Sequence, residues 1–220
     1  MHPELCFRDE GGAKAPILVW RLPHDWQGIA SGPLGGGIGS RQWVINATVP
    51  MWYDRDDPDV HLTEIAAALN LDGSGVGLMT GVDVTEVVSA AEGAVTVWAT
   101  VGLGSPILAA ASIADAAVVV APGTVNIVAS LPVRLSDAAL VNAVSTVTEA
   151  KVQALRDLGI HATGTATDAT CLVCPASGRV EAYGGPRSVY GSVLARVTYD
   201  VLMTGGRRWM SRGLAWSDRR

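Results

Sequence analysis

Lys151 is the side chain of this sequence whose type and position most clearly suggest chemistry. It lies in a segment from Ser136 to Leu158 whose apolar residues recur at helical spacing, and it falls in the middle of the apolar arc. The chain has only one other lysine, Lys14. A charge on the buried side of a helix must be paired, have its pKa shifted or reach past the core to water. Lys151 is therefore either a side chain that snorkels to water at the helix edge, or an ammonium that faces an interior site. There it would stabilise a developing oxyanion or, when deprotonated, accept a proton.

The opposite face of the same predicted helix is polar. Five side chains share this face at about 100° per residue: Asn142, Thr146, Glu149, Gln153 and Arg156. Such a stripe is typical of a solvated helix face. If the stripe lines a site instead, Glu149 is a candidate base and Asn142 a candidate substrate-binding residue.

Threonines alternate with small residues just before a predicted buried strand. In an extended segment, Thr163, Thr165 and Thr167 would place their hydroxyls on one edge that leads to Asp168. This row is either an ordinary strand edge with Asp168 as a turn former, or an alcohol nucleophile and hydrogen-bond donors beside a carboxylate, as amide hydrolysis requires. Asn126 is a further polar residue inside an apolar strand, where its amide needs partners.

The segment from Gly32 to Gly39 is rich in glycine, which suggests a close approach of the backbone to another group. Backbone N–H groups without a neighbouring Cβ can cradle an anion, but no Gly-Lys-Ser/Thr ending and no dinucleotide-binding spacing is present. Gly35, Gly36 and Gly37 therefore either lie against a bulky ligand or form a tightly packed turn.

Metal and redox chemistry find little support in the sequence. Cys171 and Cys174 have the spacing of a metal-binding pair, but they fall in a predicted strand, where positions three apart point to opposite faces. No two of the four histidines have the spacing that would place both on one face of a helix. We expect no metal site and two core cysteines.

The hydrophobic pattern predicts strands and helices that alternate irregularly. Strands are expected at residues 17–20, 42–46, 84–89, 95–101, 124–129 and 169–174, with a hairpin that joins the third and fourth. Helices are expected from Pro58 to the segment before Gly73, from Ser136 to Leu158, and at 188–204. This order favours a single layered α+β domain, with mixed β-sheets packed against about three helices; an αββα sandwich is one arrangement that fits. The domain would span residues 1–206, followed by a basic tail at 207–220.

Composition restricts the class of partner. The chain of 220 residues is 49% hydrophobic, which suits one globular domain. Its net charge is -5 although five arginines fall in the last fourteen positions, so the remainder is strongly acidic and unsuited to a nucleic-acid groove. No apolar stretch is long enough to cross a bilayer, and no signal peptide is recognisable. We therefore expect a cytoplasmic protein with a small molecule or another protein as partner.

Seven short motifs follow one another along the chain. They are Gly32 to Gly37, Asn46 to Val49 with Asp57-Pro58, Gly77 to Thr80, Gly123 to Ile127, Ala139 to Lys151, Gly164 to Ala169, and Tyr183 to Pro186. Each motif alone is weak, but their order and spacing between about residues 28 and 204 make the set specific. Together they resemble the motifs of the adenosylcobinamide amidohydrolase family of corrinoid salvage enzymes.

The resemblance implies hydrolysis of the amide that joins a propionate of the corrin ring to aminopropanol. The products would be adenosylcobyric acid, which can re-enter cobalamin assembly, and 1-amino-2-propanol. The corrinoid would be the substrate and not a cofactor, and no other cofactor is expected. The protein would be a monomer or a homo-oligomer.

Residues from both lines of reasoning coincide in the candidate site. We expect Thr165 or Thr167 to act as nucleophile or to position water, Asp168 or Glu149 to act as base, and Lys151 with the amide of Asn126 or Asn46 to polarise the carbonyl. The expected substrate-binding residues are Gly35, Gly36, Gly37, Asn46, Thr80, Asn126 and Asn142.

Two other functions fit the same residues. A non-catalytic corrinoid or tetrapyrrole carrier or sensor would use the polar groups for recognition alone. The Gly123-Thr124 and Gly164-Thr165 steps are also compatible with a threonine hydrolase that cleaves its own chain.

Overall fold

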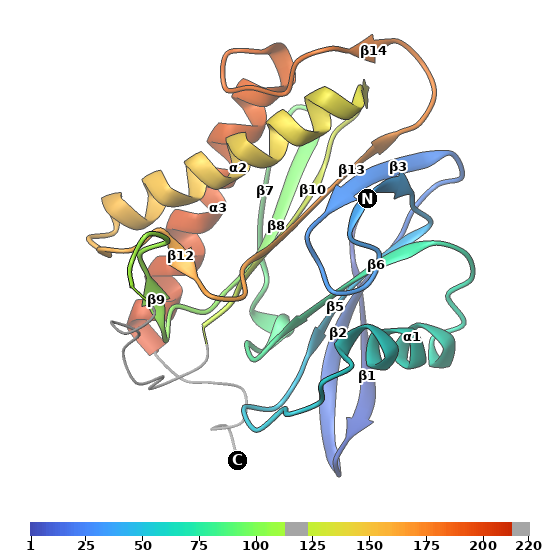
Figure 1. The fold of residues 1–220 in the computed structure, drawn as a ribbon, viewed down its shortest axis with the longest axis vertical. Coiled ribbons are helices and arrows are strands. Elements are labelled where there is room, and N and C mark those ends of the chain that lie inside the picture. The colour runs from blue at the N-terminus through green and yellow to red at the C-terminus, as the bar shows by residue number, and fades with distance from the viewer. Residues whose placement is uncertain (113–122, 213–220) are drawn as a thin grey trace.

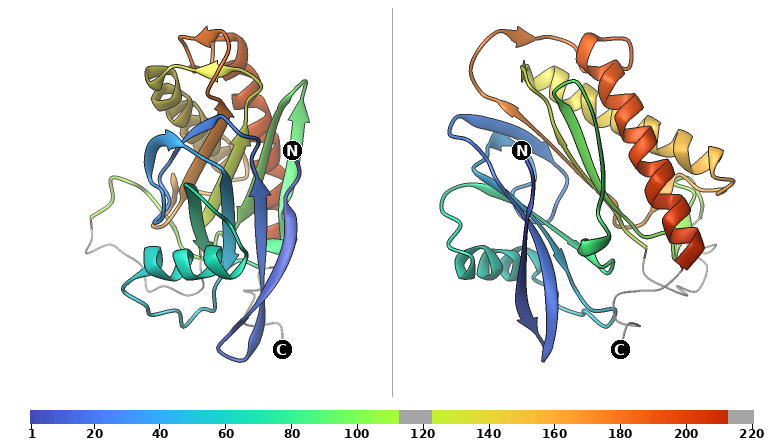
Figure 2. Two further views of the ribbon diagram at one scale, coloured as in Figure 1. Left: turned by 90° about the vertical axis from the view of Figure 1, so that its right-hand side faces the viewer. Right: turned by 180° about the vertical axis from the view of Figure 1, so that it is seen from behind.

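The protein folds into four layers, in the order helix, sheet, sheet, helices (Figure 1). The structure is a computed structural model and describes residues 1–112 and 123–212. Two β-sheets pack face to face, and helices cover both outer faces (Figures 1 and 2). The predicted α+β class is therefore confirmed, in its αββα form.

The first sheet has four strands in the order β1-β2-β5-β6. Its strands are β1 Glu4–Glu10, β2 Ala13–Arg21, β5 Trp43–Thr48 and β6 Gly75–Thr80. β5 and β6 run parallel, whereas the other pairs are antiparallel. Helix α1, Pro58–Ala68, connects β5 to β6 and covers the outer face.

The second sheet has six strands in the order β4-β3-β13-β10-β8-β7. Its strands are β3 Trp26–Ala30, β4 Gly37–Ser40, β7 Val88–Glu92, β8 Val95–Val101, β10 Val125–Ser130 and β13 Ala169–Pro175. Helices α2, Asp137–Asp157, and α3, Val189–Arg212, cover its outer face. The short elements are η1 Val84–Glu86, β9 Pro106–Ile107, β11 Arg134–Leu135, β12 Gly164–Thr165 and β14 Val180–Glu181.

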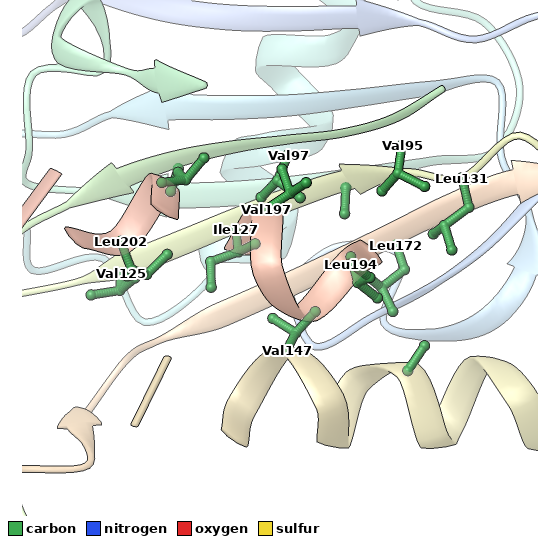
Figure 3. Close-up of a cluster of buried hydrophobic side chains, with 14 of the residues drawn as sticks. Val95, Val97, Val125, Ile127, Leu131, Val147, Leu172, Leu194, Val197 and Leu202 are labelled. Carbon is green, nitrogen blue, oxygen red and sulfur yellow. The ribbon is translucent and has the colours of Figure 1, made fainter. Parts of the chain in front are cut away.

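Strand alternation distributes the apolar side chains into three cores. In β10, Val125 and Ile127 point to α2 and α3, whereas Val128 points to the first sheet. The same alternation in β2 places Ile17 against α1 and Trp20 between the sheets. Figure 3 shows the largest of these cores, between the second sheet and its two helices. Because both sheets are covered on both faces, the central strands β5 and β10 are buried along their whole length.

The same alternation confirms that Cys171 and Cys174 are core residues on opposite faces of β13. Cys171 faces the core between the sheets, and Cys174 faces α2 and α3. Burial raises the pKa of the Cys171 thiol to about 12. Both cysteines are therefore core residues, and the two sulfur atoms do not converge.

The signals that start and end α2 also act as expected. The Ser136 hydroxyl accepts a hydrogen bond of 3.2 Å from the backbone N–H of Ala139, which caps the helix. After the helix, Gly159 has a φ of +79°, a conformation that favours glycine.

Four strands of the two main sheets were not predicted: β1, β3, β4 and β6. β1 carries four charged residues and forms one edge of its sheet, so it shows no clear apolar alternation. β3 contains Gly28, where a Cβ would lie only 2.5 Å from the carbonyl oxygen of Leu172 on β13. The glycine that weakens the strand signal is thus required by the close pairing of β3 with β13.

Two predicted boundaries are wrong. The expected strand at 84–89 begins instead as η1, because the Asp83 carboxylate caps this turn by accepting from the N–H of Thr85. The last helix does not stop at Gly205 and Gly206 but continues to Arg212, which pairs with Glu86. Residues 207–212 of the predicted basic tail therefore belong to α3, and residues 213–220 lie outside the described part of the chain.

The glycine pair lets α3 approach its neighbours closely. A Cβ on Gly205 would lie 2.6 Å from a methyl carbon of Val101 and 3.1 Å from Val88, both in strands that cannot retreat. A Cβ on Gly206 would meet mainly the end of the Leu158 side chain, which can rotate away. Close packing therefore explains Gly205 better than Gly206.

We predict that Gly205→Ala and Gly206→Ala differ in stability although both raise helix propensity. Gly205→Ala should lower the free energy of unfolding by about 1–2 kcal/mol, because overpacking outweighs the propensity gain. Gly206→Ala should leave it unchanged or raise it by up to about 1 kcal/mol. Urea unfolding followed by circular dichroism measures both; equal effects of the two changes would contradict this packing.

Candidate active site

The Asp168 carboxylate is the centre of a hydrogen-bonded group that we call the Asp168 cluster: Asp168, Lys151, Thr165 and the backbone N–H of Val125. The Lys151 ammonium forms an ion pair with Oδ2 of Asp168. The Thr165 hydroxyl donates to Oδ1 at 2.5 Å, and the N–H of Val125 donates to the same oxygen at 2.9 Å. The N–H of Thr165 donates to Oδ2 at 3.1 Å. Each carboxylate oxygen thus faces two donor groups.

Three elements bring the cluster together. α2 directs Lys151 toward the sheet, β12 and the turn that follows it carry Thr165 and Asp168, and β10 begins at Val125. The ion pair is largely buried, with the two side chains 12% and 13% exposed. Of the two roles considered for Lys151, the structure therefore places its ammonium inside, paired with a carboxylate.

Gly164 makes room for the ion pair. A Cβ built at this position would lie 2.6 Å from the Lys151 nitrogen and closer still to the Asp168 carboxylate. Any side chain here would push the two charged groups apart. The glycine of the Gly164-Thr165 step is therefore explained by the geometry of the Asp168 cluster.

The three alternating threonines do not form the single row that was expected. Residues 166 and 167 form a turn, so the segment is not extended throughout. The Thr163 hydroxyl donates to the carbonyl of Ile107, whereas the Thr167 hydroxyl lies 2.7 Å from that of Thr124. Only Thr165 contacts Asp168 through its hydroxyl. Asp168 also serves as a turn former, because it accepts the N–H of Thr165.

Two asparagines connect the sheets beside this cluster. The amide nitrogen of Asn126 donates to Oδ1 of Asn46 and to the carbonyl of Met79, both at 2.9 Å. The amide nitrogen of Asn46 donates to the Thr100 hydroxyl at 3.1 Å. Asn126 thus has the partners that its position in an apolar strand demands, although its Oδ1 is buried without one.

The cluster and the asparagines lie at the same end of the sandwich. In the register of β10 and β13, Asn126 is opposite Ala169, the residue after Asp168. Val125 and Asn126 point to opposite faces of β10, so one strand end carries both networks. Thr80 follows Met79 and ends β6. Its hydroxyl accepts a hydrogen bond from the N–H of Val82. We call this region, where β5, β6 and β8 end and β10 and β13 begin, the polar end of the sandwich.

The remaining predicted site residues lie elsewhere. Glu149 is exposed on the opposite face of α2, in a groove that it shares with Tyr199 and Asp200 of α3. Asn142, also exposed, lies next to Gly185. Gly35 packs against Gly75 at the start of β6, whereas Thr80 ends this strand. Gly35 and Thr80 therefore lie at opposite ends of β6, whereas Gly32 of the same loop packs against Gly77 in the middle of the strand.

Thr124 and Thr100 belong to the polar end but were not among the predicted site residues. Thr124 shares a hydrogen bond with Thr167, and Thr100 ends the chain of amides. Thr100 lies in a strand whose valines alternate with Thr96, Trp98 and Thr100, so the pattern predicts that it points away from the face of the valines. Nothing in the sequence alone identified that sheet or its asparagine.

The side chains of the Asp168 cluster are of the kinds that perform acid–base chemistry. A hydroxyl that donates to a carboxylate is placed to lose its proton to it, and an ammonium beside it can stabilise negative charge on a neighbouring oxygen. Within residues 1–112 and 123–212, no group of three His, Cys, Asp or Glu side chains could hold a metal ion. In the same ranges, no helix is long and apolar enough to span a membrane.

We predict strong coupling between Lys151 and Asp168 in stability. Lys151→Met should lower the free energy of unfolding by about 3–5 kcal/mol, because it leaves a buried carboxylate without its cation. The Lys151→Met/Asp168→Asn double variant should lose less than the sum of the single variants, by about 0.5–3 kcal/mol. Urea unfolding of the four proteins measures the coupling.

Lys14→Met is the matched control, because it removes the only other lysine, which lies exposed over the ring of Phe7. It should change the free energy of unfolding by no more than about 0.5 kcal/mol. Additive effects of Lys151→Met and Asp168→Asn would show that the ion pair does not stabilise the fold.

Comparison with known proteins agrees with the motifs in the sequence. The model of the adenosylcobinamide amidohydrolase family matches residues 3–213. The adenosylcobinamide amidohydrolase of Methanosarcina mazei is 29% identical over 150 residues, which are 67% of this chain and 69% of that protein. Among solved structures, the PH0078 protein of Pyrococcus horikoshii OT3 covers 93% of this chain and 82% of its own, with a TM-score of 0.49 and 9% identity. The family match spans nearly the whole chain, and the chain therefore belongs to the adenosylcobinamide amidohydrolase family.

Proposed function

We propose that this protein hydrolyses the amide between a corrin propionate and the aminopropanol of adenosylcobinamide. Water adds across the bond: the acyl carbon gains an oxygen, the C–N bond breaks, and the nitrogen leaves with a proton. The products are adenosylcobyric acid and 1-amino-2-propanol. Membership of the family and the named relative in Methanosarcina mazei support this reaction. The acid would return to cobalamin assembly in the cytoplasm, and the corrinoid is substrate, with no further cofactor in the proposal.

The observation that carries the proposal is the contact between the Thr165 hydroxyl and the Asp168 carboxylate. Amide hydrolysis needs an activated oxygen nucleophile, and a hydroxyl 2.5 Å from a carboxylate oxygen is positioned to give up its proton. Thr165 then either attacks the amide carbon, which gives an ester that a water molecule hydrolyses to the acid, or holds a water that attacks the amide carbon directly. Thr167 is the weaker candidate, because its hydroxyl contacts Thr124 and the carbonyl of Gly123 instead.

Asp168 is the better supported base. Glu149 is exposed on the far side of α2 from Lys151, whereas Asp168 contacts both the ammonium and the hydroxyl. In the proposed mechanism, Asp168 takes the hydroxyl proton as the nucleophile attacks and returns it to the leaving nitrogen. Lys151 stabilises the negative charge that develops on the carbonyl oxygen.

The asparagines are better suited to positioning than to polarising the carbonyl. Both donor positions of Asn126 can be occupied by its two acceptors, Asn46 and the carbonyl of Met79. A donor that is engaged within the protein must break a hydrogen bond before it can serve the substrate. We therefore assign carbonyl polarisation to Lys151, and assign to Asn46 and Asn126 the task of holding the two sheets together beside it.

We predict that Thr165→Val and Lys151→Met each lower the rate of amine release from adenosylcobinamide by at least about a hundredfold. Thr165→Val keeps the shape of the side chain but removes the hydroxyl, whereas Thr165→Ser keeps the hydroxyl and should retain activity. The matched control for the lost ammonium is Lys14→Met, which should act like the wild type. The measurement is the quantity of 1-amino-2-propanol released by the purified protein, with folding checked by circular dichroism.

Other outcomes would contradict the proposal in distinct ways. A wild-type protein that binds adenosylcobinamide but releases no amine is a carrier or sensor. A folded Thr165→Val protein with wild-type activity would remove the role of the hydroxyl, while leaving the reaction itself in place.

A further inference from the structure

Arg41 is a buried cation without a carboxylate partner in residues 1–112 and 123–212. It is only 7% exposed. Its guanidinium donates to three backbone carbonyls, those of Ser40 at 2.9 Å, Gly35 at 2.8 Å and Gly37 at 3.0 Å. Its Nε is buried with no hydrogen-bond partner. The carbonyl oxygens accept some of the guanidinium's hydrogen bonds, but they carry no net charge to balance its positive charge.

The other well-buried arginine shows the contrast. Arg8 forms an ion pair with Glu10, and the two side chains are 13% and 14% exposed. The ionisable side chain that interacts with Arg41 is the Cys171 thiol. Burial raises the pKa of this thiol to about 12, so it is neutral and does not balance the charge of Arg41. A buried unpaired charge is costly, so a group of opposite charge would be strongly favoured beside Arg41.

Arg41 lines a hollow of about 410 Å³ between α1, the start of β6 and the glycine-rich loop. This volume is within the range of about 300–1,000 Å³ that is typical of small-molecule sites. The walls are mainly apolar and comprise Leu34, Trp43, Ala66, Ala67 and Leu71. The hollow is separate from the polar end, because it adjoins Gly75 at the opposite end of β6 from Thr80.

Glycines shape this hollow. Gly35 has a φ of +68°, and a side chain there would collide with the backbone of Gly75. A side chain at Gly75 would in turn collide with the ring of Trp43. The loop therefore packs closely on β6 while its carbonyls hold the guanidinium in place, which fixes the cation at the wall of the hollow.

We propose that this hollow binds a small organic carboxylate, with its apolar body against Trp43 and Leu71 and its anionic group beside Arg41. A single fixed cation in apolar surroundings suits a monoanion better than phosphate, which is usually held by several donors. Nη1 of Arg41 makes one hydrogen bond within the described residues, which leaves its second N–H without a protein acceptor there. This binding site is independent of the proposed hydrolysis.

The test compares benzoate with benzamide, which has nearly the same shape but no charge, by isothermal titration calorimetry of the full chain. Benzoate should bind at least about tenfold more tightly than benzamide. Ala67→Trp fills the hollow from the exposed surface of α1 without touching the core, and should weaken benzoate binding by at least about tenfold. Arg41→Met should do the same. Arg156→Met removes an arginine whose side chain is 75% exposed, and should leave binding unchanged.

Three results would overturn the proposal: no measurable binding of benzoate, equal affinity for benzoate and benzamide, or benzoate binding that survives Ala67→Trp. An equal loss in Arg156→Met would also do so, because the net charge would then explain the effect. If Arg41→Met fails to fold, Ala67→Trp decides the question alone. None of these results depends on the hydrolysis of adenosylcobinamide.

Discussion

The structure of the polar end depends on one buried carboxylate. Asp168 is reached by a hydroxyl and an N–H from the neighbouring β12, by a cation from α2 and by an N–H from β10. The last two contacts join segments that are farther apart in the chain. A buried carboxylate is stable only when its oxygens are matched by donors and its charge by a cation. Satisfying Asp168 therefore fixes where α2 lies against the second sheet, and the same contacts place a hydroxyl and an ammonium side by side.

The second constraint is the junction between the two sheets. Their central part is joined by apolar packing, including an edge-to-face contact of Trp20 with Trp98 whose ring centroids are 5.9 Å apart. At the polar end, Asn126 and Asn46 replace this packing with directed hydrogen bonds. Hydrogen bonds between buried amides tolerate less displacement than apolar contacts, so the two sheets are held in a defined position beside the Asp168 cluster. Apolar layers give the fold its stability, and the polar end gives the site its geometry.

The sequence predicts the layers better than the contacts between them. The periodicity of a helix or a strand is a local property, so the place of Lys151 on the apolar arc of α2 and the opposite faces of Cys171 and Cys174 could be derived from spacing alone; whether the ammonium turns inward could not. The choice of Asp168 over Glu149 as the partner of Lys151 could not, because it depends on how the turn before β13 meets α2. The same limit explains why β1 was missed, since its charged residues give an edge strand no apolar pattern. It also explains Gly205, which was predicted to end a helix but lies within α3, where its lack of a side chain leaves room for Val101. In each case a tertiary contact determines what the residue does.

The most direct measurement of the central claim is a crystal structure of the Thr165→Val protein with uncleaved adenosylcobinamide. The account predicts that the amide to be cleaved lies at the polar end, with its carbonyl oxygen within hydrogen-bonding reach of Lys151 and its carbon facing the side chain at position 165. An amide bound elsewhere, for example in the groove between α2 and α3 beside Glu149, would contradict the assignment of the Asp168 cluster as the catalytic centre.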